Sequence, residues 1–253
     1  MNINKTPLAA AAVFCLAMGI PSCSPRFALT GASKKEYRLD ASLPEDRGVV
    51  EEYLPYKRQL DSAMNIVVGT SDHPLTKPYD SAETLLGDFF CEALMQQARQ
   101  LGAAPDICVA TKGGLRSDLP RGPITVGKVY ELMPFENELV TVTLKAVEVQ
   151  KLLDFIAASG GQPEAGIRMT IRAKKAVDVS IGGRPFDENR PYILLTYDYL
   201  AAGAEHLDFL RGLPQQHLHK KVRDALLDHI RQQTVAHKNI NIQTDGRVTV
   251  DIH

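Results

Sequence analysis

The sequence predicts an α+β domain, in which a mixed sheet is packed with helices. Segments with helical spacing of apolar residues are interspersed with short apolar or alternating runs, and several of these runs follow one another without a helix between them. With 44% hydrophobic and 23% charged residues, the chain has ordinary globular composition. Such a composition supports one domain of about 200 residues with a real core.

Helical spacing is found in residues 46–65, 81–101, 127–132, 146–158 and 220–232. Pro55 lies inside the first segment and should kink or restart the helix there. The second segment is the clearest, because its apolar residues recur on one face and Gly102 follows as a stop.

Strand patterns occupy residues 66–68, 106–111, 138–144, 167–173, 177–181 and 192–196. In the third of these, Val140, Val142 and Leu144 alternate onto one face. Residues 239–252 alternate on both sides of Asp245-Gly246, which predicts a C-terminal β-hairpin with a primed turn.

The N-terminus has the features of an export signal. Lys5 gives a positive start, and residues 7–20 form an apolar run of a length typical of a signal-peptide core. Cys23 follows a small residue at the end of this run, as in a bacterial lipoprotein cleavage site. We therefore expect a signal peptide over residues 1–22, a lipidated Cys23 and a tether over residues 23–45, with ordinary signal cleavage as the alternative. The folded domain is expected over residues 46–253.

Charge and cysteine content limit the partners. The formal net charge is -1, whereas a surface that follows a nucleic acid backbone normally shows a strong basic excess. The densest basic piece, residues 220–223, is interpreted as a solvated helix face. Cys91 and Cys108 lie in apolar patterns, so both are interpreted as small core residues without a disulfide.

Three polar clusters are candidates for a binding site. Gly113-Gly114-Leu115-Arg116 follows a buried strand, where glycines allow close backbone approach and the arginine suits a phosphate or carboxylate. The alternative for this cluster is a structural turn with a surface arginine.

The other two clusters contain aromatic residues. Phe135 and Asn137 lie between a turn and a strand, and offer a ring face and an amide. Tyr199 follows a strand and leads to a turn of small residues that contains Glu205. The alternatives are a core role for Phe135 and, for both clusters, turns with incidental aromatics.

Five features follow one another in the sequence: the strand over residues 106–111, the GGxR turn, the block from Pro123 to Asn137, the alternating strand over residues 138–144, and Thr196-Tyr197-Asp198-Tyr199. In this order they resemble the C-terminal domain of bacterial 5'-nucleotidases and UDP-sugar hydrolases. The resemblance runs from about residue 46 to residue 232. It includes the helix that joins the two domains in that family, here residues 46–65.

The resemblance implies that the domain binds the nucleoside part of a nucleotide. Arg116 would hold a phosphate or carboxylate, with Gly113 and Gly114 beside it. Phe135 and Tyr199 would sandwich the base, and Asn137 would hydrogen-bond to it. Glu205 would replace an aspartate that holds the ribose hydroxyls.

The chain departs from the family at Lys112, where asparagine is usual, and at residues 203–206, where the family has G-G-D-G. The family's N-terminal metallophosphatase domain uses D-x-H, G-N-H and paired-histidine motifs, which have no counterpart here. We therefore expect no catalytic residues, metal site or cofactor in this chain, and assign His217-Leu218-His219 to the surface.

The function expected is that of an exported substrate-binding half of a 5'-nucleotidase in nucleotide catabolism. A separate metallophosphatase chain would supply the divalent metals and the hydrolysis, and the lipid anchor would hold the protein to a membrane on the periplasmic side. The alternative is a nucleoside-binding or structural lipoprotein that works alone without a catalytic role.

Overall fold

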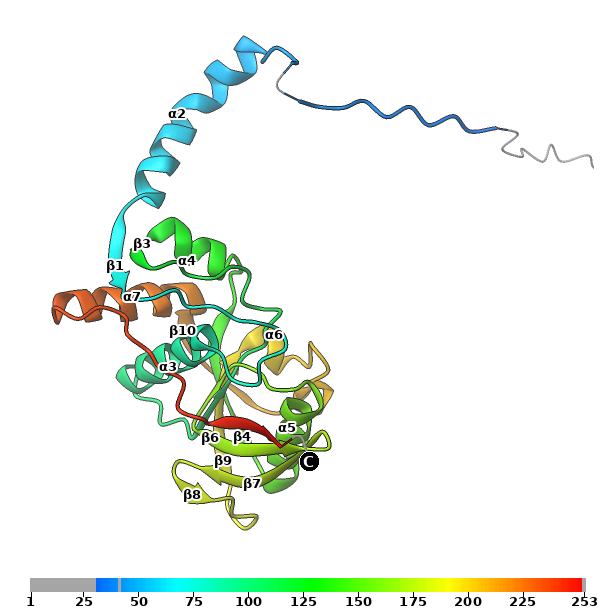
Figure 1. The fold of residues 1–253 in the computed structure, drawn as a ribbon, viewed down its shortest axis with the longest axis vertical. Helices are drawn as coiled ribbons and strands as arrows, with labels where there is room; N and C mark the ends of the chain where they lie inside the picture. Colours follow the sequence, from blue (N-terminus) through cyan, green and yellow to red (C-terminus); the bar gives the residue numbers. More distant parts are fainter. Residues whose placement is uncertain (1–30, 41, 252–253) are drawn as a thin grey trace, which may run out of the picture. The chain divides into compact units, whose positions relative to one another are not determined.

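The computed structural model describes residues 31–40 and 42–251, so the predicted signal peptide and Cys23 lie outside the described residues (Figure 1). Residues 31–40 form no helix or strand. The contacts divide the chain into two units, residues 1–50 and residues 51–253. Within residues 31–40 and 42–251, no helix is both long enough and apolar enough to cross a membrane.

Helix α2 spans Arg47–Met64 and matches the helix predicted over residues 46–65. It runs unbroken through Pro55, so the predicted restart does not occur. None of its residues is buried, and Tyr53, Tyr56 and Leu60 are exposed. An isolated helix of this length is marginal in water, so α2 presents apolar side chains that the described residues leave uncovered.

The main sheet has five strands in the order β10-β4-β9-β2-β5. They are β2 (Ile107–Val109), β4 (Glu138–Leu144), β5 (Glu164–Ala165), β9 (Tyr192–Tyr197) and β10 (Gln215–Lys221). Strands β2 and β9 pair in parallel and the other pairs are antiparallel, which confirms the predicted mixed sheet.

Helices cover this sheet and bury its centre. Helix α3 (Leu85–Gln100) contacts β2, β5 and β9, and α5 (Ala146–Ala158) contacts β4. Helix α7 (Val222–Val235) packs on α3 and on β1. Consecutive residues of β4, from Leu139 to Val142, are buried, which is the burial expected of a strand covered on both faces.

The helix predicted over residues 81–101 is observed as α3, which begins four residues later, and the two cysteines follow the prediction. Thr84 is the N-cap residue, and its hydroxyl accepts a hydrogen bond from the Gly87 amide at 3.1 Å. Cys91 in α3 and Cys108 in β2 are both buried and free, as expected of small core residues.

Two smaller sheets complete the fold. Strands β1 (Val67–Ser71) and β3 (Gly122–Thr125) form an antiparallel pair, and β3 leads into α4 (Val126–Leu132). The other sheet has the order β11-β6-β7-β8, formed by β6 (Ile167–Arg172), β7 (Lys175–Ile181), β8 (Arg184–Pro185) and β11 (Val248–Asp251). A short helix α6 (Asp198–Ala201) and a 3-10 turn (Asp208–Leu210) follow β9.

The hairpin predicted over residues 239–252 is wrong. Strand β11 pairs in parallel with β6, and Ile240 forms a parallel bridge with Ser71 of β1 instead of facing β11. Gly246 adopts a φ of 71°, so the turn predicted at Asp245-Gly246 redirects the chain towards β6 without folding it back on itself.

A buried arginine explains this different path. Arg247 is 7% exposed, and its guanidinium forms ion pairs with Glu92 and Asp88 of α3 and with Asp245. The Glu83 carboxylate, just before α3, accepts hydrogen bonds from the amides of Asp245 and Gly246 at 2.7 and 3.2 Å. These charge-assisted contacts fix the C-terminal segment on α3 and leave β6 as the partner for β11.

The strand β10 was not expected from the sequence. Its residues, QQHLHKK, look like a polar approach to a helix, but they pair with β4 at the edge of the main sheet. His217 and His219 are exposed on this strand, in agreement with their assignment to the surface. An edge strand can be polar because only one side of it pairs with a neighbour.

Candidate functional site

Strand direction brings the predicted site residues to one edge of the main sheet. Because β2 and β9 are parallel, their carboxyl ends lie at the same edge, and the antiparallel β4 begins there. The three segments at this edge are residues 111–116, 134–138 and 198–206. They contain all seven residues that the sequence singled out.

The glycine turn after β2 is closed by its own backbone and packed against β9. The Gly114 amide donates to the Thr111 carbonyl at 3.0 Å. A Cβ atom on Gly114 would lie 2.6 Å from the hydroxyl oxygen of Tyr197, whereas one on Gly113 would meet only Glu205, at 4.0 Å. Gly114 is therefore required for packing, and Gly113 leaves open space beside the Glu205 carboxylate.

Arg116 lies just beyond the turn and is exposed. Its amide donates to the Leu132 carbonyl at 2.8 Å, and its Nη1 donates to the Gly113 carbonyl at 3.1 Å. The guanidinium is thus held beside the glycine turn, and its remaining donors are available to an anion.

The two predicted stacking residues lie just outside neighbouring strands, Phe135 before β4 and Tyr199 in α6 after β9. Leu139 of β4 pairs with Tyr197 of β9. Phe135 and Tyr199 lie a few residues beyond this pair, on the same side of it. Both rings are accessible, with exposed fractions of 39% and 50%. The edge of the sheet therefore carries two aromatic side chains that the core does not use.

Glu205 joins the turn after β9 to the glycine turn after β2. Its Oε1 accepts a hydrogen bond from the Tyr199 hydroxyl at 3.5 Å, and its Oε2 lies beside Gly113. Glu205 and His206 have φ values of 54° and 68°, in the left-handed region that favours glycine. The backbone of this turn suits the glycines of the resembled family even where the residues differ.

Arg223 is a site residue that the sequence analysis missed. Residues 220–223 were interpreted as a solvated face, but Arg223 is 4% exposed. Its guanidinium lies 4.0 Å from the ring centroid of Tyr130, donates to the Phe135 carbonyl at 3.3 Å and pairs with Glu136. Its approach to Glu136 follows from the pairing of β10 with β4, which the sequence did not indicate.

These contacts fix the segment that carries Phe135 and Asn137. Lys221 also pairs with Glu136, and hydrogen bonds from Lys221 and Arg223 lower the pKa of Glu136 to about 2. The Asn137 carbonyl accepts from the amide of Val222 at 2.9 Å. The start of α7 therefore anchors the segment of residues 135–137 through both its backbone and its charges.

Lys112 has a supporting role in the structure. It is 5% exposed, and its ammonium donates to the carbonyls of Tyr79 and Ser81 at 3.1 and 2.7 Å. Burial lowers its pKa. The lysine that replaces the family's usual asparagine thus ties residues 79–81 to the glycine turn.

The site offers two aromatic rings, a guanidinium, a carboxylate and an amide. In the described part of the chain, no three His, Cys, Asp or Glu side chains are grouped so that they could hold a metal ion. The arrangement can stack a flat ring and hydrogen-bond to polar groups around it.

Comparison with known proteins identifies the family. The sequence model of the family described as 5'-nucleotidase, C-terminal domain, matches residues 67–211, which is more than half of the chain. The chain belongs to this family, and the resemblance found in its motifs is confirmed.

Curated relatives are similar over most of this chain but are much longer. UshA of Yersinia enterocolitica is 27% identical over 177 residues, which cover 68% of this chain and 32% of the relative. A probable 5'-nucleotidase of Treponema pallidum is 26% identical over 232 residues, 79% of this chain and 38% of the relative. The chain thus spans about a third of the length of these relatives.

Solved structures share the fold. A 5'-nucleotidase precursor from Thermus thermophilus superimposes with a TM-score of 0.70 at 23% identity, covering 83% of this chain and 44% of that one. The NAD nucleotidase of Haemophilus influenzae gives a TM-score of 0.63 at 17% identity, covering 81% of this chain and 41% of that one.

The two glycines of the turn provide a matched test of its packing. We expect Gly114→Ala to lower the free energy of unfolding by about 1–3 kcal/mol, because its methyl group would collide with the buried Tyr197 hydroxyl. Gly113→Ala should change it by less than about 0.5 kcal/mol, because its methyl group meets open space. Urea unfolding of both variants measures the difference, and equal effects would contradict the packing described here.

Proposed function

We propose that this chain is the substrate-binding half of a 5'-nucleotidase. The observation that carries the proposal is the pair of exposed rings, Phe135 and Tyr199, at the edge where β2, β4 and β9 meet. A nucleoside base between two such rings gains stacking of about 1–3 kcal/mol per base. Membership of the 5'-nucleotidase C-terminal family supports the same assignment.

Each polar group around the rings has a proposed partner on the nucleotide. Asn137 hydrogen-bonds to the base, because an amide can donate and accept at once. Glu205 binds the ribose hydroxyls beside Gly113, and Arg116 binds a phosphate oxygen through its free donors. The Ala204 methyl and the longer carboxylate of Glu205 narrow the ribose side of the site relative to G-G-D-G.

Removal of either ring tests the stacking. We expect Phe135→Ala and Tyr199→Ala each to weaken adenosine binding at least tenfold, measured by calorimetric titration, since about 1.4 kcal/mol of lost stacking corresponds to that factor. Both rings are partly exposed, so the variants should keep the thermal unfolding of the wild type.

Tyr56→Ala is the matched control, because Tyr56 is an exposed aromatic residue of α2 outside the site. Its titration curve should match that of the wild type. Wild-type affinity in both ring variants would rule out the aromatic sandwich.

We propose that a separate metallophosphatase chain carries the hydrolysis. The resembled enzymes use a dimetal domain for phosphoryl transfer, and its D-x-H, G-N-H and paired-histidine motifs have no counterpart in this sequence. Helix α2 is the proposed docking surface, because Tyr53, Tyr56 and Leu60 are exposed and no α2 residue is buried. Exposed apolar side chains grouped on one helix are typical of an interaction site.

A reconstitution assay tests whether substrate binding and hydrolysis lie on separate chains. Phosphate release from AMP with Mn²⁺ should be absent for this chain alone and should appear when a metallophosphatase-domain protein of the same organism is added. Leu60→Asp in α2 should abolish the activity of the mixture and leave the adenosine titration unchanged. Chelator-sensitive release by the pure chain would contradict the proposal.

No activity in the mixture would favour the alternative, a nucleoside-binding or structural lipoprotein that works alone. The two functions are distinguished by the same variants. A stand-alone binding protein would lose nucleoside affinity in Phe135→Ala, yet Leu60→Asp would have no effect in either assay.

We further propose that the protein is exported and anchored through Cys23. The basic start, the apolar run and the cysteine after Ser22 support this assignment. A fatty-acid analogue added to growing cells should label the wild-type protein and fail to label Cys23→Ser. Equal labelling of the two would show that Cys23 is not the anchor.

A further inference from the structure

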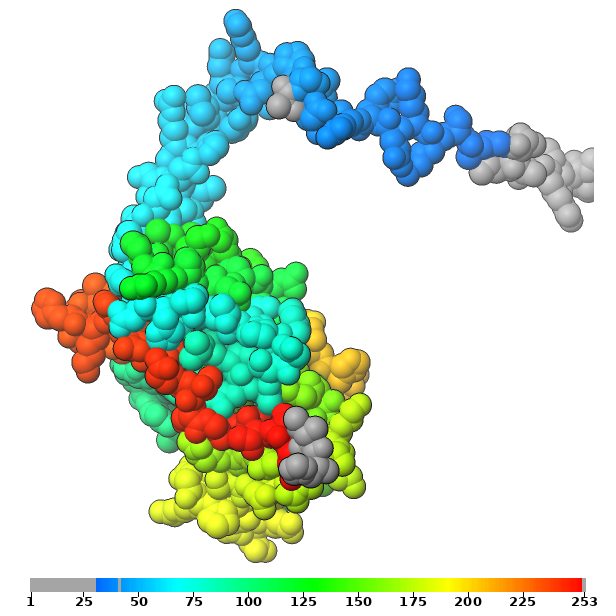
Figure 2. Space-filling view, viewed as in Figure 1, coloured from blue at the N-terminus to red at the C-terminus, as the bar shows by residue number. Residues whose placement is uncertain are grey.

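Helix α2 carries a stripe of apolar side chains without a cover. None of its residues is buried, and side chains along it are accessible in the space-filling view (Figure 2). Tyr53, Tyr56 and Leu60 are 42%, 70% and 55% exposed, and Ala63 is exposed as well. Met64, the last residue of α2, packs against the core, so the helix is joined to the domain at this end. In the described part of the chain, nothing buries the stripe formed by the other four residues.

The spacing of this stripe is that of a coiled coil. Tyr53, Tyr56, Leu60 and Ala63 follow one another at intervals of 3, 4 and 3 residues. Apolar residues at these intervals occupy positions a and d of a heptad, here a for Tyr53 and Leu60 and d for Tyr56 and Ala63. Pro55 falls at position c, away from this seam, and α2 runs unbroken through it. Such a seam is buried when a second helix packs along it.

The charges beside the seam indicate which helix fits. In residues 51–64, position g is occupied by Glu52 and Gln59, and position e by Lys57 and Met64. Glu52 and Lys57 are thus the charged residues that flank the seam. They are five residues apart, about 140° around a helix of 3.6 residues per turn, so they do not face each other within one helix. An ion pair between these two positions therefore forms between two helices.

Two copies of α2 are complementary when they lie in parallel. In a parallel pair, a residue at g of one helix lies opposite the residue at e that comes five places later in the other. Glu52 of each copy therefore meets Lys57 of the other copy, which gives two ion pairs by symmetry. In an antiparallel pair, e faces e and g faces g, so no glutamate meets a lysine. The charges therefore favour a second copy of this chain in parallel orientation.

We propose that α2 pairs in parallel with α2 of a second copy of this chain. The stripe of each copy is then buried against its counterpart, which removes apolar surface from water. Lys57 also pairs with Asp61 of its own helix at 2.5 Å, with both side chains 53% exposed. An exposed pair of this kind is weak, and an ammonium group has three donors, so Lys57 can bind Glu52 of the second copy as well.

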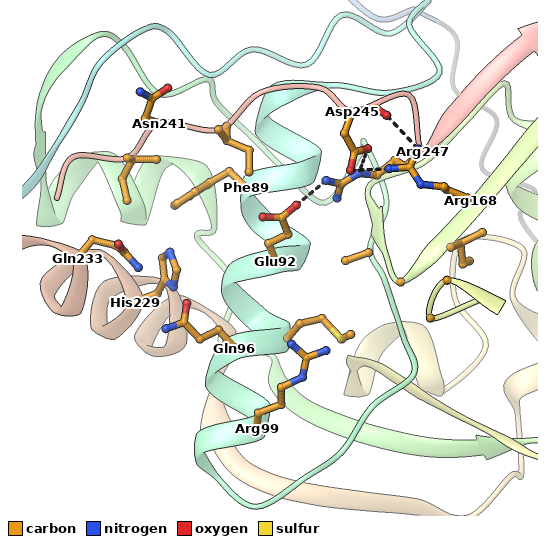
Figure 3. A pocket seen from close by; sticks show the side chains of 18 of the residues that line it. Phe89, Glu92, Gln96, Arg99, Arg168, His229, Gln233, Asn241, Asp245 and Arg247 are labelled. Atoms are coloured by element: carbon orange, nitrogen blue, oxygen red, sulfur yellow. Dashed lines mark hydrogen bonds and ion pairs between the residues drawn. The ribbon is translucent and has the colours of Figure 1, made fainter. Parts of the chain in front are cut away.

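The charged surface beside α3 does not select a partner in this way. Figure 3 shows Arg247 of a pocket on this surface with Glu92 and Asp245, and Asp245 also pairs with Arg168. These ion pairs form within the chain and need no second molecule. On α2, by contrast, the two charges that flank the apolar stripe are placed to pair between copies.

The same stripe includes residues proposed to dock a metallophosphatase chain, so the two associations exclude each other. The pairing of two copies rests on the spacing and charges of α2 and does not depend on the proposed function. It covers the stripe when no metallophosphatase chain is bound. A reconstitution assay without activity would therefore leave the pairing of two copies unaffected.

Sedimentation velocity of the purified chain tests the pairing. We expect the wild type to shift from the mass of a monomer to that of a dimer as its concentration is raised. Leu60→Asp places a charge in the seam and should raise the dissociation constant at least tenfold. Glu52→Lys and Lys57→Glu should each have a similar effect, because each sets like charges opposite one another at two places.

Exchange of the charges tests the parallel orientation. The double variant Glu52→Lys/Lys57→Glu should return the dissociation constant to within threefold of the wild type, because opposite charges again face each other. An equimolar mixture of the two single variants should associate as a mixed dimer for the same reason. An antiparallel pair would show neither recovery.

Arg58→Glu is the matched control, because Arg58 is exposed, lies at position f away from the seam, and alters the net charge as much as Lys57→Glu does. It should dimerise within twofold of the wild type, and far-UV circular dichroism should show equal helix content in all variants. The proposal is overturned if the wild type stays monomeric at every concentration, if Leu60→Asp dimerises like the wild type, or if exchange of the charges restores nothing.

Discussion

The parallel pairing of β2 with β9, with β4 antiparallel beside them, is the constraint on which the site depends. It gathers the glycine turn after β2, the aromatic segment before β4 and the turn after β9 at one edge of the main sheet. Ligand sites at the carboxyl ends of parallel strands follow the same geometry in open α/β sheets. A shift of one residue between β4 and β9 would turn every β4 side chain to the other face and displace the segments before β4 and after β9 relative to each other.

Buried cations hold the loops of this edge in place. Arg223 binds the Phe135 carbonyl and Glu136, and Lys112 binds the carbonyls of residues 79 and 81. Arg247 forms ion pairs with Asp88 and Glu92 and thereby holds the C-terminal segment on α3. A hydrogen bond to a charged group is stronger than a neutral one, and leaving a buried carbonyl unpaired is costly. The loops that carry the candidate site are therefore held in place by buried side chains from other parts of the chain.

Local patterns predicted much of the fold, and long-range pairing accounts for what they missed. Strand β4 and helix α5 have the bounds that apolar periodicity indicated, although β4 is buried on both faces and not only on the face of its alternating residues. Strand β10 is polar because it forms an edge, so no periodicity marks it. The hairpin pattern around Asp245-Gly246 was overridden by Arg247, whose partners lie on α3 more than 150 residues earlier in the chain. The order of the motifs predicted the candidate site residues. The position of Arg223 could not be predicted in this way, because it depends on the pairing of β10 with β4.

The candidate site combines a sheet that fixes the backbone with turns whose side chains differ from those of the resembled family. The Thermus thermophilus 5'-nucleotidase precursor shares the fold at 23% identity, so the frame tolerates extensive substitution. In this chain the turn at residues 203–206 keeps glycine-like backbone angles at Glu205 and His206 while presenting different side chains. Because this turn lies outside the strands, its side chains can differ without any change in the pairing of β4 with β9. On the proposed function, the turn residues determine the ribose side of the site, and the sheet positions the segments that carry Phe135 and Tyr199.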